Sequence, residues 1–137
     1  MLVNWSKIKY FKPYEFNAPY KIQHEILEGL DAFRHFLGVK IIPTSDYRLG
    51  DKGEHGKGCA IDIIIPEFHN NIIDIYLKAE RFNFQGIGVY SYWKYNGKRV
   101  GGLHLDKGGR KNPARWVCIE KDKYIAMNYK NLKLLLL

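Results

Sequence analysis

The chain has 137 residues, of which 46% are hydrophobic and 15% aromatic, so it is not a disordered protein and fits one folded domain spanning 1–137. Its formal net charge of +8 predicts attraction to a polyanion, and nucleic acid, anionic lipid and anionic cell wall all qualify. No segment approaches the roughly 18 apolar residues that a membrane span requires, so we expect no transmembrane segment. Two cysteines, Cys59 and Cys118, are too few for a disulfide framework and are expected to be buried thiols.

An irregular arm and one long helix are predicted at the start of the chain. Residues 1–19 contain two prolines and many aromatic side chains, which favours an arm that wraps the core. From Tyr20 onward apolar residues recur at three- and four-residue steps, a pattern typical of an amphipathic helix, and Gly38 ends it. The stripe expected to be buried consists of Ile22, Ile26, Leu27, Leu30, Phe33, Phe36 and Leu37.

A strand, a loop and a second strand are predicted next. The β-branched run 39–42 predicts a short strand that ends at Pro43. Glycine and charged residues fill 45–58, which predicts an exposed loop. Residues 60–65 are apolar apart from Asp62 and are expected to form a strand.

The second half of the chain predicts one more helix, over 70–81, followed by strands. The buried stripe of this helix is expected to be Ile72, Ile73, Tyr76, Leu77 and Phe82. Strands are expected over 86–90, 100–105, 116–119 and 124–127, with a turn over 95–98. The expected helices come early in the chain and most of the expected strands come late. This order favours a single α+β domain with a central, largely antiparallel sheet and two main helices. Its core would span 20–127, with a C-terminal tail over 128–137 that covers a core edge or meets a partner.

Asp62 is the anomaly in this pattern, because a buried ionised carboxylate is costly unless it is paired or bound to a cation. Period-two alternation turns Asp62 away from the face that carries Ile61 and Ile63. His55 lies seven residues upstream, and the glycines between them allow the loop to fold back so that His55 and Asp62 converge.

A second polar pair, His104 and Asp106, shares one face of a predicted strand. Two imidazoles and one carboxylate, with a fourth position left to water, form a known catalytic zinc set. Spacing alone supports equally a plain structural interpretation, in which His55 is exposed, His104 is hydrogen-bonded and half-buried, and Asp62 is salt-bridged.

Four sequence elements together resemble the zinc D-Ala-D-Ala carboxypeptidase and murein endopeptidase family, the LAS-type metallopeptidases, which includes many phage endolysins. Residues 55–62, HGKGCAID, match the family pattern HxxGxAxD. Residues 45–48, SDYR, are similar to its S-G-Y-R stretch, 86–90, GIGVY, to its G-x-G-x-Y element, and 103–106, LHLD, to its V-H-x-D element. The elements occur in the family's order and cover about 20–116.

The resemblance implies a hedgehog/D,D-peptidase-like fold and one Zn²⁺ ion per chain, held by His55, Asp62 and His104. It also implies that Arg48, with Tyr47 beside it, binds and orients the substrate peptide and that Arg48 assists catalysis. Asp106 is expected to hold His104 by a hydrogen bond or to accept a proton.

The chain departs from the family pattern mainly near the last histidine. Several branches carry a Glu or His two or three residues before it, as the base, whereas this chain has Gly101 and Gly102. Glu54, beside the first ligand, is a substitute candidate for the base, although an exposed loop glutamate is the simpler interpretation. Asp46 replaces the usual glycine before Tyr47.

The function expected from these elements is zinc-dependent hydrolysis of a peptidoglycan amide bond, as in an endolysin, with cell-wall peptides as the partner. One alternative is a D-Ala-D-Ala carboxypeptidase. Another is a non-catalytic metal-binding, structural or wall-binding module of a phage particle, and nucleic-acid binding through the basic surface ranks last.

The expected location follows from the same resemblance. The first sixteen residues have no continuous apolar stretch and no small-residue cleavage site, so they do not read as a secretory signal. A phage-encoded protein made in the host cytoplasm and acting on the wall, or carried in the virion, is therefore expected, with a periplasmic or secreted protein as the alternative.

Overall fold

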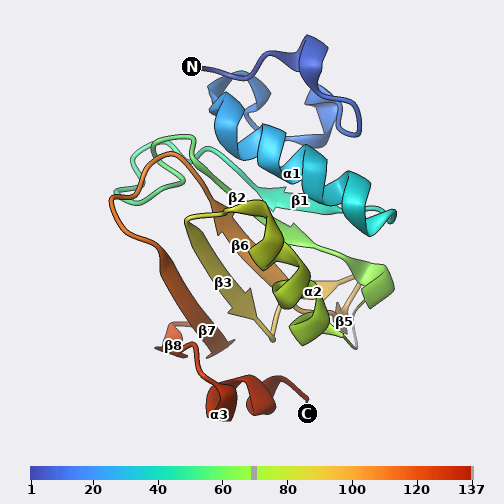
Figure 1. Ribbon diagram of the computed structural model, residues 1–137, viewed down its shortest axis with the longest axis vertical. Helices are drawn as coiled ribbons and strands as arrows, with labels where there is room; N and C mark the ends of the chain where they lie inside the picture. The colour runs from blue at the N-terminus through green and yellow to red at the C-terminus, as the bar shows by residue number, and fades with distance from the viewer. Residues whose placement is uncertain (69–70, 137) are drawn as a thin grey trace.

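A central sheet of six strands organises the protein, whose computed structural model describes residues 1–68 and 71–136 (Figure 1). In spatial order the strands are β1 (Ile42–Ser45), β2 (Ala60–Ile64), β6 (Gly102–Asp106), β3 (Gly86–Tyr90), β7 (Ala114–Glu120) and β8 (Lys123–Ala126). β3 and β7 run parallel, and the other neighbouring pairs run antiparallel. A separate hairpin joins β4 (Lys94–Tyr95) to β5 (Lys98–Arg99). The predicted single α+β domain with a largely antiparallel sheet is confirmed.

The helices are α1 (His24–Leu37), α2 (Ile72–Ala79) and the short α3 (Tyr129–Leu132). The 3₁₀ turns are η1 (Trp5–Lys7), η2 (Pro13–Glu15), η3 (Pro19–Lys21), η4 (Pro66–Phe68), η5 (Glu80–Phe82) and η6 (Lys133–Leu136). Within the described part of the chain, no helix is both long and apolar enough to cross a membrane.

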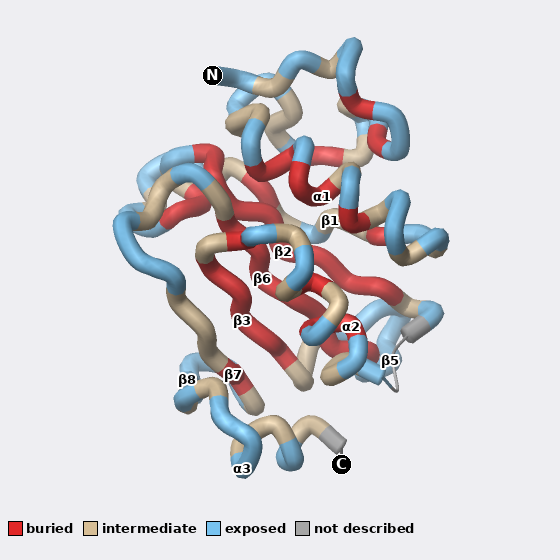
Figure 2. The backbone as a smooth tube through the Cα atoms, in the orientation of Figure 1, coloured by how far each residue is buried: buried red, intermediate tan, exposed pale blue. Residues whose placement is uncertain are grey.

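The hydrophobic core lies between the sheet and the helices α1 and α2, which pack on one face of it (Figure 1). The strand residues that point to this face are fully buried, and they are Ile61, Ile63, Ile87, Val89, Leu103 and Leu105. Figure 2 shows β2, β6 and β3 as continuously buried strands at the centre of the molecule. Because side chains alternate along a strand, Asp62 and His104 lie on the opposite face.

The chain ends complete the core. In the N-terminal arm, Ile8, Phe11 and Phe16 are buried in the same cluster as the helix residues. At the other end, Leu132 and Leu135 of the tail are partly buried against that cluster. The tail therefore covers an edge of the core.

The helix α1 confirms most of its predicted stripe, but it begins at His24 rather than at Tyr20 because the 3₁₀ turn η3 occupies Pro19–Lys21. Ile22 precedes the helix and is still fully buried. Phe36, which the stripe included, is 42% exposed. The helix ends at Gly38, in the left-handed conformation with φ of 70°.

The stripe predicted for α2 was wrong in part. The structure buries Ile75, Tyr76 and Ala79, whereas Leu77 is 55% exposed. Two overlapping apolar stripes exist on this helix, and periodicity cannot tell which one contacts the sheet. The predicted start, residue 70, lies outside the described residues.

The first strand also differs from its prediction, because β1 includes Pro43 instead of stopping before it. A proline removes one backbone donor, which an edge strand tolerates, and β1 pairs only with β2. The turn predicted over 95–98 is confirmed by the β4–β5 hairpin, and Cys59 and Cys118 are both buried free thiols as expected.

Candidate metal centre

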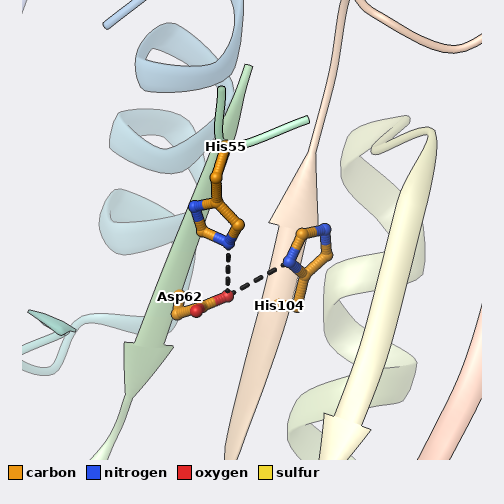
Figure 3. A group of neighbouring side chains, drawn as sticks. All are labelled: His55, Asp62 and His104. Atoms are coloured by element: carbon orange, nitrogen blue, oxygen red, sulfur yellow. Dashed lines mark hydrogen bonds and ion pairs between the residues drawn. The ribbon is translucent and has the colours of Figure 1, made fainter. Parts of the chain in front are cut away.

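Three side chains that are distant in sequence converge on the helix-free face of the sheet (Figure 3). His55 comes from the loop before β2, while Asp62 on β2 lies directly opposite His104 on β6. The Asp62 Oδ1 atom is 3.2 Å from His55 Nε2 and 3.1 Å from His104 Nδ1. All three residues are buried, and their ligand atoms lie within 4.8 Å of one another. This group could hold a metal ion.

The outer nitrogen of each imidazole has a partner that can only accept a hydrogen bond. His55 Nδ1 lies 2.7 Å from the backbone oxygen of Asp46, so it carries the proton of a neutral ring. His104 Nε2 lies 2.7 Å from Asp106 Oδ2 and carries its proton for the same reason. The inner nitrogens of both neutral rings therefore present lone pairs toward the Asp62 carboxylate. Three lone-pair donors that face one another require a cation between them, either protons or a metal.

The titration of Asp62 agrees with such a site. When protons rather than a metal lie between these groups, the rings donate to Asp62; burial opposes its ionisation, but the hydrogen bonds from His104 and His55, together with their charges, outweigh burial and lower the pKa of Asp62 to about 2. Asp62 is therefore a carboxylate at neutral pH. Burial also opposes the charged form of His104, yet its hydrogen bonds to Asp106 and Asp62 raise its pKa above the ordinary value.

The loop that carries His55 is ordered by a buried carboxylate. Asp46, only 1% exposed, accepts hydrogen bonds from the backbone N–H groups of Asn17 (2.8 Å), Ala18 (2.9 Å) and Tyr47 (2.9 Å). It ties the N-terminal arm to the start of the loop and aims its own carbonyl at His55. The prediction of an exposed loop over 45–58 was therefore wrong for Asp46, Glu54 and His55, which are buried.

Glycines on this face of the sheet make room for larger side chains. A Cβ atom on Gly88 would lie 2.4 Å from the ring of Trp116, and one on Gly102 would lie 2.5 Å from the ring of Trp93. Gly102 is one of the two glycines that stand where several branches of the similar family carry a catalytic base. Trp93 covers that position, so a side chain there has no room.

A cavity of about 570 Å³ opens over the three converging residues. One wall is aromatic, formed by Tyr90, Tyr92, Trp93, Trp116 and Tyr124. The other lining residues are polar or charged, apart from Gly53, and include Arg48, Asp51, Glu54, Arg110, Lys121 and Asp122. A second cavity of about 330 Å³ is lined by Thr44, Arg48, Asp62, Ile64, Trp93 and Lys94. The two share Arg48, Asp62 and Trp93, so they form one cleft with two lobes.

The remaining residues predicted for the site divide between this cleft and its surroundings. Arg48 lines both lobes, and its Nη2 atom donates to Asp62 Oδ2 at 2.8 Å. Tyr47 is half-buried and does not line the cleft. Asp106 is fully buried behind His104 and does not line the cleft itself. Glu54 lines the larger lobe and forms an ion pair with Lys57 at 3.1 Å.

The sequence analysis did not predict two kinds of residue that the structure places at the site. Trp93 and Trp116 gave no signal, since aromatic residues in strands usually belong to the core. Arg110 pairs with Asp106 through two contacts of 2.9 Å, and its position four residues after Asp106 was the only available hint.

Comparison of the chain with protein-family models, with curated proteins and with solved structures finds no match. The geometry and chemistry of the cleft, together with the sequence motifs, therefore carry the functional argument.

Proposed function

We propose that the protein is a zinc-dependent peptidoglycan hydrolase that cleaves an amide bond of cell-wall peptides. The observation that carries the proposal is the convergence of His55, Asp62 and His104, with three lone-pair donors aimed at one point on the floor of a cleft. The order of the motifs that resemble the LAS-type metallopeptidases supports the same conclusion.

The metal in this proposal is zinc. Two imidazoles and one carboxylate are a catalytic zinc set that leaves a position for water. When bound, zinc supplies a Lewis acid that lowers the pKa of water and polarises an amide carbonyl. The outer hydrogen bonds to the Asp46 carbonyl and to Asp106 hold the two rings in the orientation that binding requires.

Arg48 is suited to orient the substrate. Its side chain is 46% exposed and stands where the two lobes meet, beside Asp62. A guanidinium at this point can donate to a carbonyl or carboxylate of a peptide that crosses the cleft. The aromatic wall of the larger lobe supplies apolar contact area for the rest of the substrate.

Glu54 is the stronger candidate for proton acceptance, and Asp106 acts as a positioning residue. A general base must come within hydrogen-bond reach of the attacking water, directly or through one other water molecule. Glu54 lines the cleft beside a ligand, whereas Asp106 is sealed below His104. A Glu54→Gln variant is therefore expected to lose roughly a hundredfold in kcat while keeping its metal.

The shape of the cleft favours cleavage of an internal bond over removal of a terminal D-alanine. Both lobes have Asp62 in their lining, so the cleft has room for more peptide than a single terminal residue. The net charge of +8 favours an anionic polymer as the substrate.

The test is incubation of the purified protein with peptidoglycan fragments, with and without a chelator, and identification of the products by mass. His55→Ala serves as the inactive variant, and His35→Ala, an exposed histidine on α1, serves as the matched control. Chelator-sensitive cleavage of an internal bond, lost in His55→Ala and kept in His35→Ala, supports the proposal.

Other outcomes assign the alternative functions. Loss of only the terminal alanine supports a carboxypeptidase. Bound zinc without any product supports the non-catalytic module, and steeply salt-dependent retention on DNA, without cleavage, supports nucleic-acid binding.

A further inference from the structure

Arg110 contacts Asp106, the residue that supports the candidate metal ligand His104. Its Nε atom donates to Asp106 Oδ1 at 2.9 Å, and its Nη2 atom lies 2.9 Å from Asp106 Oδ2. Asp106 Oδ2 in turn lies 2.7 Å from His104 Nε2. A continuous chain of charged and polar contacts thus connects Arg110 to the ring that faces Asp62.

We propose that Arg110 is a positioning residue for the metal centre, acting through Asp106 to hold His104 with its Nδ1 lone pair turned toward Asp62. The inference rests on the proposed metal centre. The bidentate guanidinium occupies both Asp106 oxygens, so the carboxylate stays in one orientation and accepts the Nε2–H of His104.

The two candidate histidine ligands differ in what holds them. A backbone carbonyl orients His55, so the atom that contacts this ring is present whatever the side chain at position 46. His104 depends on the side chain of Asp106, and Asp106 depends on Arg110. The orientation of His104 is therefore the part of the site that a remote side chain controls.

A second set of contacts holds Arg110 itself in place. The Gln85 side chain accepts from the backbone N–H groups of Gly108 (2.9 Å) and Arg110 (3.1 Å) and donates to the Arg110 carbonyl (3.1 Å). The Arg110 guanidinium also lies over the Trp116 ring, 5.4 Å from its centroid, and that ring packs against His104 at 5.0 Å. Arg110 thus contacts two groups that bound the imidazole.

Arg115 provides a matched control. Its side chain is 25% exposed, against 28% for Arg110, and it forms a bidentate pair with Glu80 at 2.8 Å for each bond. Among the described residues, it has no contact with the candidate ligands. Arg115→Ala removes a comparable ion pair, together with hydrogen bonds to the backbone carbonyls of Phe84, Gln85 and Ala114, and it leaves the contacts among Arg110, Asp106 and His104 in place.

The first experiment measures the zinc affinity of folded variants by competition with a chelator. Arg110→Ala is expected to raise the zinc Kd by roughly 10–100-fold, Arg110→Lys by less, and Arg115→Ala by less than about twofold. In an Asp106→Ala background, Arg110→Ala is expected to add less than about twofold, since the effect passes through Asp106. A zinc Kd for Arg110→Ala as close to wild type as that of Arg115→Ala would overturn the proposal. If Arg110→Ala does not fold, an unchanged Kd in Arg110→Lys would do the same.

The second experiment does not depend on metal. Nitrogen NMR of the metal-free protein at alkaline pH, where the ring is neutral, is expected to find the Nε2–H form of His104 in wild type and a mixture of forms in Arg110→Ala. An unchanged tautomer in the variant would overturn the proposal. A shifted tautomer in a protein that binds no zinc would support the positioning role and refute the metal centre.

Discussion

Gly86 is the position where the structure permits the sharpest prediction, because no side chain fits beside Asp106. A Cβ atom built on Gly86 would lie 2.0 Å from Asp106 Oδ2 and 2.6 Å from Oδ1, closer than real contacts permit. In Gly86→Ala the carboxylate must move by about 1 Å or more, which breaks its alignment with Arg110 and His104. Since Asp106 is fully buried, its charge then loses partners that it cannot replace with water.

The loss of stability in Gly86→Ala can be estimated from the free energy that is lost when a buried ion pair is broken. Removing one partner of such a pair costs about 3–5 kcal/mol, and we expect about 3 kcal/mol here because the groups are displaced rather than deleted. For a chain of 137 residues this lowers Tm by roughly 10 °C. Zinc affinity is expected to fall by roughly 10–100-fold as well, because His104 loses its support.

Thermal unfolding and chelator competition measure these two effects, with Gly53→Ala as the control for stability. A Cβ atom on Gly53 meets only Asp51 Oδ1, at 3.2 Å, so this exposed position is expected to change stability by less than about 0.5 kcal/mol. A Gly86→Ala protein within about 1 kcal/mol of wild type, with unchanged zinc affinity, would show that the contacts of Asp106 do not support the site.

Three other substitutions test the site, the core and one ion pair. His104→Ala is expected to abolish stoichiometric zinc by elemental analysis, and retention of the metal would contradict the ligand assignment. Leu30→Ala is expected to cost about 3 kcal/mol in denaturant unfolding, since Leu30 is fully buried, and a loss below about 1 kcal/mol would contradict its place in the core. The hydrogen bond from Arg115 lowers the pKa of Glu80, so the pair stabilises the protein above the ordinary carboxyl pKa and less as pH falls through the folded-state value. Glu80→Gln is therefore expected to be about 1 kcal/mol less stable at pH 7, with the difference closing below roughly pH 4, and a constant difference across this range would refute the ion-pair explanation.

The sequence by itself was enough to predict the core strands and the long helix, while the three candidate ligands were named through the resemblance to a known family of metallopeptidases. Alternation placed Asp62 opposite the apolar side chains of its strand, and the structure confirms that arrangement. Such predictions succeed because they depend on local periodicity and on the cost of burying a charge. The same periodicity could not choose between two apolar stripes on α2, because that choice depends on where the helix meets the sheet.

Only the tertiary structure decided how the site is supported and what surrounds it. Asp106 and Glu54 are both acids beside a candidate ligand in sequence, yet one is sealed below His104 and the other lines the cleft. Trp93 covers Gly102 although nine residues separate them, and Arg110 reaches Asp106 through a loop that Gln85 closes. These contacts depend on strand order and loop closure, and no local pattern in a sequence encodes which distant side chain will fill the space that a glycine leaves.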